Sequence, residues 1–163
     1  MINNLNSILP FLSDLAQNNN RSWFQENRER YDIARQAILD LTATLIAEIG
    51  QFDPQVRYLE PKECLFRIYR DTRFSLDKSP YKRHFGIYIA MNGGHRSLFS
   101  GYYIHLQPGN CMLSGGIWCA DNQGIKRFRS YIDTEYEELF DIMAHPDFKH
   151  YFGDHLTCFE SLK

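Results

Sequence analysis

Residues 101–118 read "GYYIHLQPGNCMLSGGIW" and contain the strongest signal for the fold. Two strand-like segments, "GYYIHLQ" and "CMLSGGIW", flank Pro108-Gly109-Asn110, which has the composition of a tight turn. Short β-rich segments joined by such a turn are typical of a β-hairpin. We therefore predict two antiparallel strands, at 100–107 and 110–118.

Two earlier segments show the same strand-like pattern. "CLFRIY" places Cys64, Phe66 and Ile68 on one side, and "HFGIYIAM" places Phe85, Ile87 and Ile89 on one side. This period of two residues predicts strands at 64–69 and 84–91. Together with the hairpin they indicate a mostly antiparallel sheet of about four or more strands.

Helical patterns stand on both sides of the strand-rich region. Ser7 is placed to cap a helix that runs to about Ala16, and Ser22-x-x-Gln25 resembles a capping box for a helix starting near Trp23. One apolar stripe then predicts a long helix near 28–49 that covers the sheet. The stripe consists of Tyr31, Ala34, Ile38, Leu41, Leu45 and Ile49.

A further helix is expected after Thr134-x-x-Glu137, which is another capping-box pattern, and Pro146 should stop it. The order helix, strands, helix predicts the α+β class, with N-terminal and C-terminal helices packed on the sheet. A length of 163 residues with 44% apolar content fits a single domain, 1–163.

Composition excludes several classes of protein. The net charge of −2 gives no global attraction to nucleic acid or to anionic lipid. The first residues resemble no signal peptide, and no segment is apolar enough to span a membrane, so we expect a reduced, cytoplasmic protein. The spacing of Cys64, Cys111, Cys119 and Cys158 matches no metal site, so we expect no metal and no cofactor, and Cys111 and Cys119 should behave as small hydrophobic residues.

Positive charge is concentrated in residues 64–86, "CLFRIYRDTRFSLDKSPYKRHFG", which we call the basic segment. From 57 to 86 there are eight Lys or Arg residues and four acids, whereas the rest of the chain has ten and sixteen. A rigid loop carrying guanidinium and ammonium groups suits a phosphate or a carboxylate, since arginine offers two parallel donors and lysine a point charge.

The basic segment therefore predicts a site for a small anionic ligand that bears phosphate or carboxylate. Either His105 or Asp71 would move a proton if the site is catalytic. The expected ligand-binding residues are Arg67, Arg70, Arg73, Lys78, Tyr81 and Lys82.

Two other functions stay open at this point. The charged residues could form a structural salt-bridge network in a scaffold or protein-interaction domain, with Arg70 next to Asp71 and Asp77 near Lys78 or Lys82. The protein could also be a nucleic-acid-binding module in which Tyr69, Phe74 and Tyr81 stack on bases, although the acidic balance of the chain argues against it.

The alternation of the strands adds an expectation about one face of the sheet. His105 shares a strand face with Tyr103 and Gln107, while Ser114 and Trp118 share another. If the strand register brings these faces together, they form a polar concavity lined by aromatic rings. Register is not determined by these patterns alone.

Three motifs resemble one widespread bacterial and fungal family of uncharacterised proteins, described as a conserved domain of unknown function. They are "FRIYRDTRFSLDKSPYK" at 66–82, "NNNRSWFQENRERYDIAR" at 18–35 and "GYYIHLQPGNCMLSGGIW". The resemblance spans most of the chain but implies no specific activity. It also implies a longer C-terminus than this chain has, and a proline near Cys119, where Ala120 stands instead.

Overall fold

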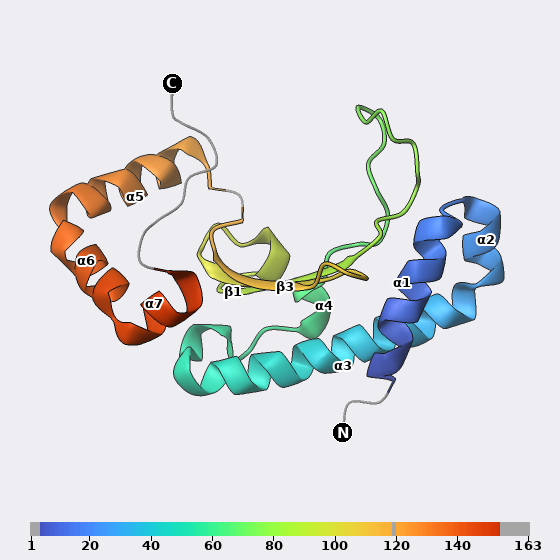
Figure 1. The fold of residues 1–163 in the computed structure, drawn as a ribbon, viewed down its shortest axis with the longest axis horizontal. Coiled ribbons are helices and arrows are strands. Elements are labelled where there is room, and N and C mark those ends of the chain that lie inside the picture. The colour runs from blue at the N-terminus through green and yellow to red at the C-terminus, as the bar shows by residue number, and fades with distance from the viewer. Residues whose placement is uncertain (1–3, 119, 154–163) are drawn as a thin grey trace. The chain divides into compact units, whose positions relative to one another are not determined.

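A computed structural model describes residues 4–118 and 120–153 (Figure 1). The chain divides into two compact units, Met1–Cys119 and Ala120–Lys163, and each is considered by itself. The prediction of a single domain stays a prediction. None of the described helices combines the length and the apolar content needed to cross a bilayer.

Most helices of the first unit precede its sheet in the sequence, and one short helix lies between its first and second strands. The helical elements are η1 (Leu5–Ser7), α1 (Ile8–Gln17), α2 (Arg21–Glu26), α3 (Arg28–Phe52), η2 (Pro54–Val56), α4 (Pro61–Cys64) and η3 (Gly94–Arg96). The strands are β1 (Phe85–Ala90), β2 (Gly101–Leu106) and β3 (Met112–Gly116). The α+β class is therefore confirmed, with a largely helical N-terminal region.

The described strands form one three-stranded antiparallel sheet in the order β1-β2-β3. The predicted strands 84–91, 100–107 and 110–118 are confirmed with slightly narrower bounds, and β2 and β3 make the predicted hairpin. The register pairs Gly86 with His105 and Tyr103 with Ser114. Because directly paired residues project from the same side of a sheet, these residues share one face.

The predicted strand 64–69 is wrong, because Cys64 ends helix α4 and the following residues form only isolated bridges. Leu65 bridges to Ile87 on β1, whereas Tyr69 bridges to Tyr81 in a different segment. Because these two bridges have partners in different segments, residues 65–69 do not form one continuous β-ladder. The alternation in "CLFRIY" indicates an extended, half-buried backbone. A sheet strand and a loop held by isolated bridges can both have such a backbone.

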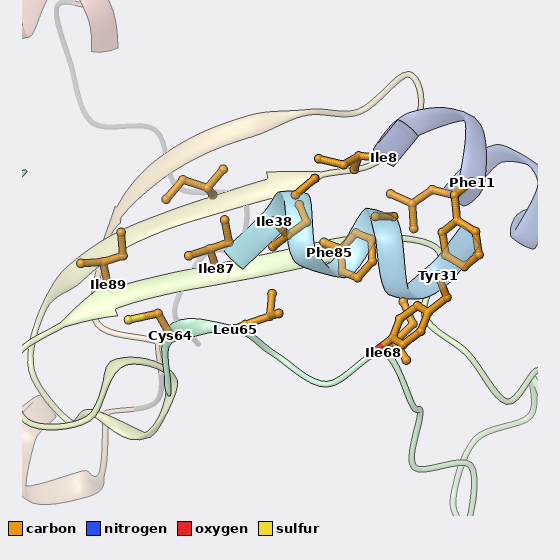
Figure 2. Close-up of a cluster of buried hydrophobic side chains, with 14 of the residues drawn as sticks. Ile8, Phe11, Tyr31, Ile38, Cys64, Leu65, Ile68, Phe85, Ile87 and Ile89 are labelled. Carbon is orange, nitrogen blue, oxygen red and sulfur yellow. The ribbon is translucent and has the colours of Figure 1, made fainter. Parts of the chain in front are cut away.

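The core lies between α3 and the sheet, as the stripe near 28–49 predicts. Ile38 on α3 and Ile87 and Ile89 on β1 have no exposed surface, and Figure 2 shows them in one cluster with Phe85. Cys64 joins the same cluster and is fully buried. Both faces of β1 are buried, which makes this strand the centre of the unit.

Two of the predicted helix starts need correction. Asn20, not Ser22, caps α2, because its side-chain oxygen accepts a hydrogen bond from the backbone N–H of Trp23. Thr134 is the last residue of α5 and donates its hydroxyl back to the Ser130 carbonyl, so it caps no helix. Both errors arise because several neighbouring polar residues satisfy the same capping pattern.

The second unit contains α5 (Asn122–Thr134), α6 (Tyr136–Ala144) and α7 (Pro146–Phe152). The predicted stop before Pro146 is confirmed, and Pro146 itself begins α7, where its fixed φ and missing N–H are tolerated. The packing of these helices on the sheet stays a prediction. Cys119 and Cys158 lie outside the described residues.

Candidate functional site

The basic segment runs out from the sheet and returns to it, in the long loop drawn in green in Figure 1. Two backbone hydrogen bonds close the base of this loop: Arg70 N–H donates to the Pro80 carbonyl at 2.9 Å, and Lys82 N–H donates to the Ile68 carbonyl at 2.8 Å. The side chains on either side of this closure therefore have different surroundings. Those beyond it face other loop residues, and those before it face the helices.

Arg70 lies inside the loop and acts as its internal brace. Its guanidinium donates to the Asp77 carboxylate at 2.6 Å, to the Ser79 carbonyl at 3.2 Å and to the Ser75 hydroxyl at 3.2 Å, and it also contacts the Ser79 hydroxyl. Lys78 adds a bond from its ammonium group to the Thr72 carbonyl at 3.0 Å. In this part of the segment the contacts that are present are those of a structural salt-bridge network.

Arg73 and Asp71 form a second pair in the loop. The guanidinium binds both carboxylate oxygens, with Nε to Oδ1 at 3.0 Å and Nη2 to Oδ2 at 2.7 Å. The hydrogen bonds from Arg73 lower the pKa of Asp71. A carboxylate held in its ionised form by a bidentate partner is a poor proton acceptor, so the geometry gives no support to the proton-transfer role expected for Asp71.

Tyr81 belongs to the core and does not face open space. Its ring is 3% exposed and stacks on Phe24 with a centroid separation of 4.0 Å and an interplanar angle of 11°. The Asn19 amide holds its backbone from both sides, accepting from Tyr81 N–H at 3.1 Å and donating to its carbonyl at 3.0 Å. Of the three rings considered for base stacking, only Tyr69 and Phe74 are exposed.

A pocket with a volume of about 410 Å³ lies between the start of the basic segment, α3 and α4. Among the residues that the structure describes, four cationic side chains and no carboxylate line it. The lining residues are Tyr31, Arg35, Lys62, Leu65, Phe66, Arg67, Ile68, Tyr69, Lys82, Phe85 and His95. We call this the cationic pocket.

The four cations of this pocket are Arg35, Lys62, Arg67 and Lys82. Within residues 4–118 and 120–153, none of them makes an ion pair. The contrast with Arg70 and Arg73, which both have carboxylate partners, divides the basic segment into a braced loop and an uncompensated pocket.

Lys82 is partly buried and lies over an aromatic ring. Its amine lies 5.3 Å from the ring centroid of Phe66, which also lines the pocket. Burial lowers the pKa of Lys82, and the neighbouring Arg67 lowers it further. A bound anion would counteract the effect of Arg67, because it would supply the missing opposite charge.

Sequence reasoning missed Arg35 and Lys62 as pocket residues. Arg35 comes four residues after Tyr31 on α3, so both project from the same side of that helix into the pocket. Lys62 lies in the single turn of α4, which replaces the start of the expected strand 64–69. The spacing from Tyr31 could have pointed to Arg35, whereas nothing in the sequence placed Lys62.

His105 lies on the opposite face of the sheet from the core and does not line the cationic pocket. Its ring nitrogens contact the Tyr103 hydroxyl at 2.9 Å and the Gln107 side-chain oxygen at 3.1 Å. Its ring stacks on His84 at 4.3 Å, and burial, His105 and Lys82 together lower the pKa of His84 to about 4. The expected grouping of His105 with Tyr103 and Gln107 is therefore confirmed.

The residues expected to line an aromatic concavity on this face lie together, while the concavity itself stays a prediction. The register places Ser114 opposite Tyr103, and Trp118 stacks on Tyr103 with ring centroids 5.5 Å apart. Phe66 packs against both rings and also lines the cationic pocket, so it separates the two features. Cys111, expected to be a small hydrophobic residue, is exposed.

The loop brace makes a prediction about stability. Arg70→Ala should lower the free energy of unfolding by about 1–2 kcal/mol at neutral pH, because several partly exposed hydrogen bonds to one charged group are lost. Bonds from Ser79 and then from Arg70 lower the folded-state pKa of Asp77 to about 2. The contribution of this carboxylate is present above its unfolded pKa of about 4 and is lost as the pH falls towards 2.

The deficit of Arg70→Ala should therefore shrink between about pH 4 and pH 2, as measured by urea unfolding at several pH values. Arg73→Ala is the matched control, because its pair is exposed and braces no other part of the loop. If the two variants lost the same free energy of unfolding at every pH, the Arg70 contacts would not stabilise the fold more than the exposed Arg73 pair does.

Comparison with known families identifies one match. The model of a family described as conserved hypothetical protein (DUF2461) matches residues 7–163, which is nearly the whole chain. No curated protein and no solved structure matches the chain.

Proposed function

Since the chain belongs to this family of conserved hypothetical proteins, DUF2461, whose description names no activity, we propose its function from geometry: it binds a small anionic ligand in the cationic pocket. The ligand carries phosphate or carboxylate. In this proposal Arg67 and Lys82 contact the anion, while Arg70, Arg73 and Lys78 support the loop and do not contact it.

The observation that supports the proposal is that no carboxylate of residues 4–118 and 120–153 lines the pocket. Its lining includes four cations and no carboxylate, and those four make no ion pair within the part of the chain that the structure describes. A structural network would have matched cations with acids, as the loop does for Arg70. Like charges gathered without compensation repel one another, and a bound anion relieves that repulsion.

The composition of the pocket also suits a small molecule. A volume of about 410 Å³ is within the usual range for small-ligand sites. Guanidinium groups such as those of Arg35 and Arg67 can each give a carboxylate or phosphate two parallel hydrogen bonds. Apolar walls from Leu65 and Phe85 would keep the charged groups partly shielded from water, which strengthens each contact.

The test is the melting temperature in the presence of anions. At constant ionic strength, inorganic phosphate, pyrophosphate and citrate should raise the melting temperature of the wild type above its value in chloride. Ligand at a hundred times its dissociation constant stabilises the folded state by about 2.7 kcal/mol. Arg67→Ala should lose this stabilisation, because it removes one uncompensated charge from the pocket.

Arg73→Ala serves as the control, since it removes the same type of side chain from the same segment but outside the pocket. It should respond to anions as the wild type does. An equal response of wild type and Arg67→Ala would exclude the cationic pocket as the binding site. An unchanged melting temperature with every anion would favour the scaffold interpretation.

A further inference from the structure

Lys82 is held in the cationic pocket more rigidly than its flexible side chain suggests. Its backbone N–H donates to the Ile68 carbonyl at 2.8 Å. The preceding residue, Tyr81, is clamped on both sides by Asn19 and stacks on Phe24. The backbone of Lys82 is therefore fixed at the edge of the pocket, directly by Ile68 and through Tyr81 by Asn19 and Phe24.

The surroundings of the Lys82 amine are unusual for a lysine. The charged or titratable groups that share the cationic pocket with it are Tyr31 and Arg35 from α3, Lys62 from α4, and Arg67, Tyr69 and His95, and none of these is a carboxylic acid. Lys82 also borders a second pocket of about 220 Å³, where the charged or titratable groups are Arg70, Asp77, Tyr81, Arg83 and His84. The one carboxylate there, Asp77, is paired with Arg70. The Lys82 amine makes no hydrogen bond to any residue among those described, and it lies over the face of the Phe66 ring, 5.3 Å from the centroid.

These surroundings make the Lys82 amine easier to deprotonate than that of an exposed lysine. Arginine cannot give up its proton in a protein, so of Arg67 and Lys82 it is the lysine whose proton is more easily lost. Burial and Arg67 act in the same direction and lower the pKa of Lys82. A partly desolvated lysine beside a second cation is the arrangement that activates amines as nucleophiles towards carbonyl groups.

We propose that the Lys82 amine forms a Schiff base with a small aldehyde or ketone that also carries a carboxylate or phosphate. The inference rests on the proposed anion site, which would hold the charged end of the compound near Arg67. The cavity and the fixed backbone of Lys82 supply the geometry, since a ligand anchored on the neighbouring cations brings its carbonyl carbon within reach of the amine.

The chemical step is balanced without any oxidant or reductant. The nitrogen lone pair of Lys82 attacks the carbonyl carbon, a C–N bond forms, and the carbonyl oxygen takes up a proton to give a carbinolamine. The carbinolamine then loses its hydroxyl group as water, with protons exchanged through solvent, and a C=N bond remains. Hydrolysis reverses the step, so the adduct is reversible until it is reduced.

Reductive trapping tests this proposal on the full chain. Glyoxylate, which carries one aldehyde and one carboxylate, is incubated with the protein and sodium cyanoborohydride, and modified lysines are quantified by peptide mass spectrometry. Lys82 should be labelled at least about tenfold faster than Lys78, because the pocket concentrates the probe beside its amine. Saturating inorganic phosphate should suppress labelling at Lys82 and leave Lys78 unchanged.

Two variants separate this inference from the binding function. Lys82→Arg removes the reactive amine, so it should take up no label at position 82. Lys78→Arg alters a lysine of the same segment that lies outside the pocket, so it should leave both the labelling of Lys82 and the stabilisation by phosphate unchanged.

Phosphate stabilisation that depends on Arg67, together with labelling of Lys82 no faster than that of Lys62 or Lys78, would overturn the Schiff-base inference and leave the anion site standing. If phosphate neither raised the melting temperature nor suppressed labelling of Lys82, both the anion site and the Schiff-base inference would be overturned.

Discussion

Phe24→Ala is expected to lower the free energy of unfolding by about 3–5 kcal/mol, the usual cost of removing a large buried aromatic side chain. Phe24 is fully buried. Its ring stacks on Tyr81 at 4.0 Å and lies 5.0 Å from Tyr31 and 6.4 Å from Phe11. The substitution would leave a cavity where α1, α2, α3 and the basic segment meet.

Urea unfolding followed by tryptophan fluorescence measures this loss, with an unchanged m-value as evidence that unfolding stays two-state. Phe74→Ala is the matched control, because the Phe74 side chain is 95% exposed and should change stability by less than about 0.5 kcal/mol. If Phe24→Ala lowered the free energy of unfolding by no more than Phe74→Ala does, the result would contradict the packing of α2 against the basic segment.

The loss at Phe24 should also reach the cationic pocket. Tyr81 immediately precedes Lys82, and Tyr31 lines the pocket itself. A cavity at Phe24 removes the support of both rings. We therefore expect anions to stabilise Phe24→Ala less than the wild type at a temperature where both are folded.

Gly101→Ala is expected to have the second-largest effect, a loss of about 1–3 kcal/mol, because the new methyl group meets atoms that cannot move aside. A Cβ at position 101 would lie 2.5 Å from the Ile89 carbonyl oxygen and 2.5 Å from the Ala90 Cβ. Both contacts belong to the buried strand β1, which pairs with β2 at this position. Relief of the clash therefore requires the two strands to separate.

Gly115→Ala provides the comparison within the same sheet. A Cβ there would come no closer than 3.8 Å to the Gly101 carbonyl oxygen, so the methyl group fits. Its effect on the unfolding free energy should be below about 0.5 kcal/mol. Thermal and urea unfolding of the pair measure the difference, and equal stability of the two variants would contradict the close pairing of β1 and β2.

Local sequence patterns were sufficient for much of the fold. The alternation in "HFGIYIAM" and the turn at Pro108-Gly109-Asn110 predicted β1, β2 and β3, and the apolar stripe from Tyr31 to Ile49 predicted α3. These features succeed because periodicity and turn chemistry act within a few residues. The same reasoning failed at 64–69, since an extended loop and a sheet strand alternate their side chains in the same way.

The sequence also identified the region of positive charge but not the role of each cation in it. Arg67, Arg70 and Arg73 are equivalent by composition and lie within seven residues of one another. In the folded chain Arg70 and Arg73 pair with Asp77 and Asp71, whereas Arg67 lines a pocket without an acid.

What the sequence by itself determined is therefore the position of β1, β2 and β3, the long helix and the location of the basic segment. Only the tertiary structure decided which charges stay uncompensated, because α3 contributes Arg35 and α4 contributes Lys62 from outside that segment. The electrostatic surroundings of a side chain depend on every group packed near it in space, and the bridge from Tyr69 to Tyr81 and the Asn19 clamp on Tyr81 bring those groups together. Periodicity along the chain does not contain that information.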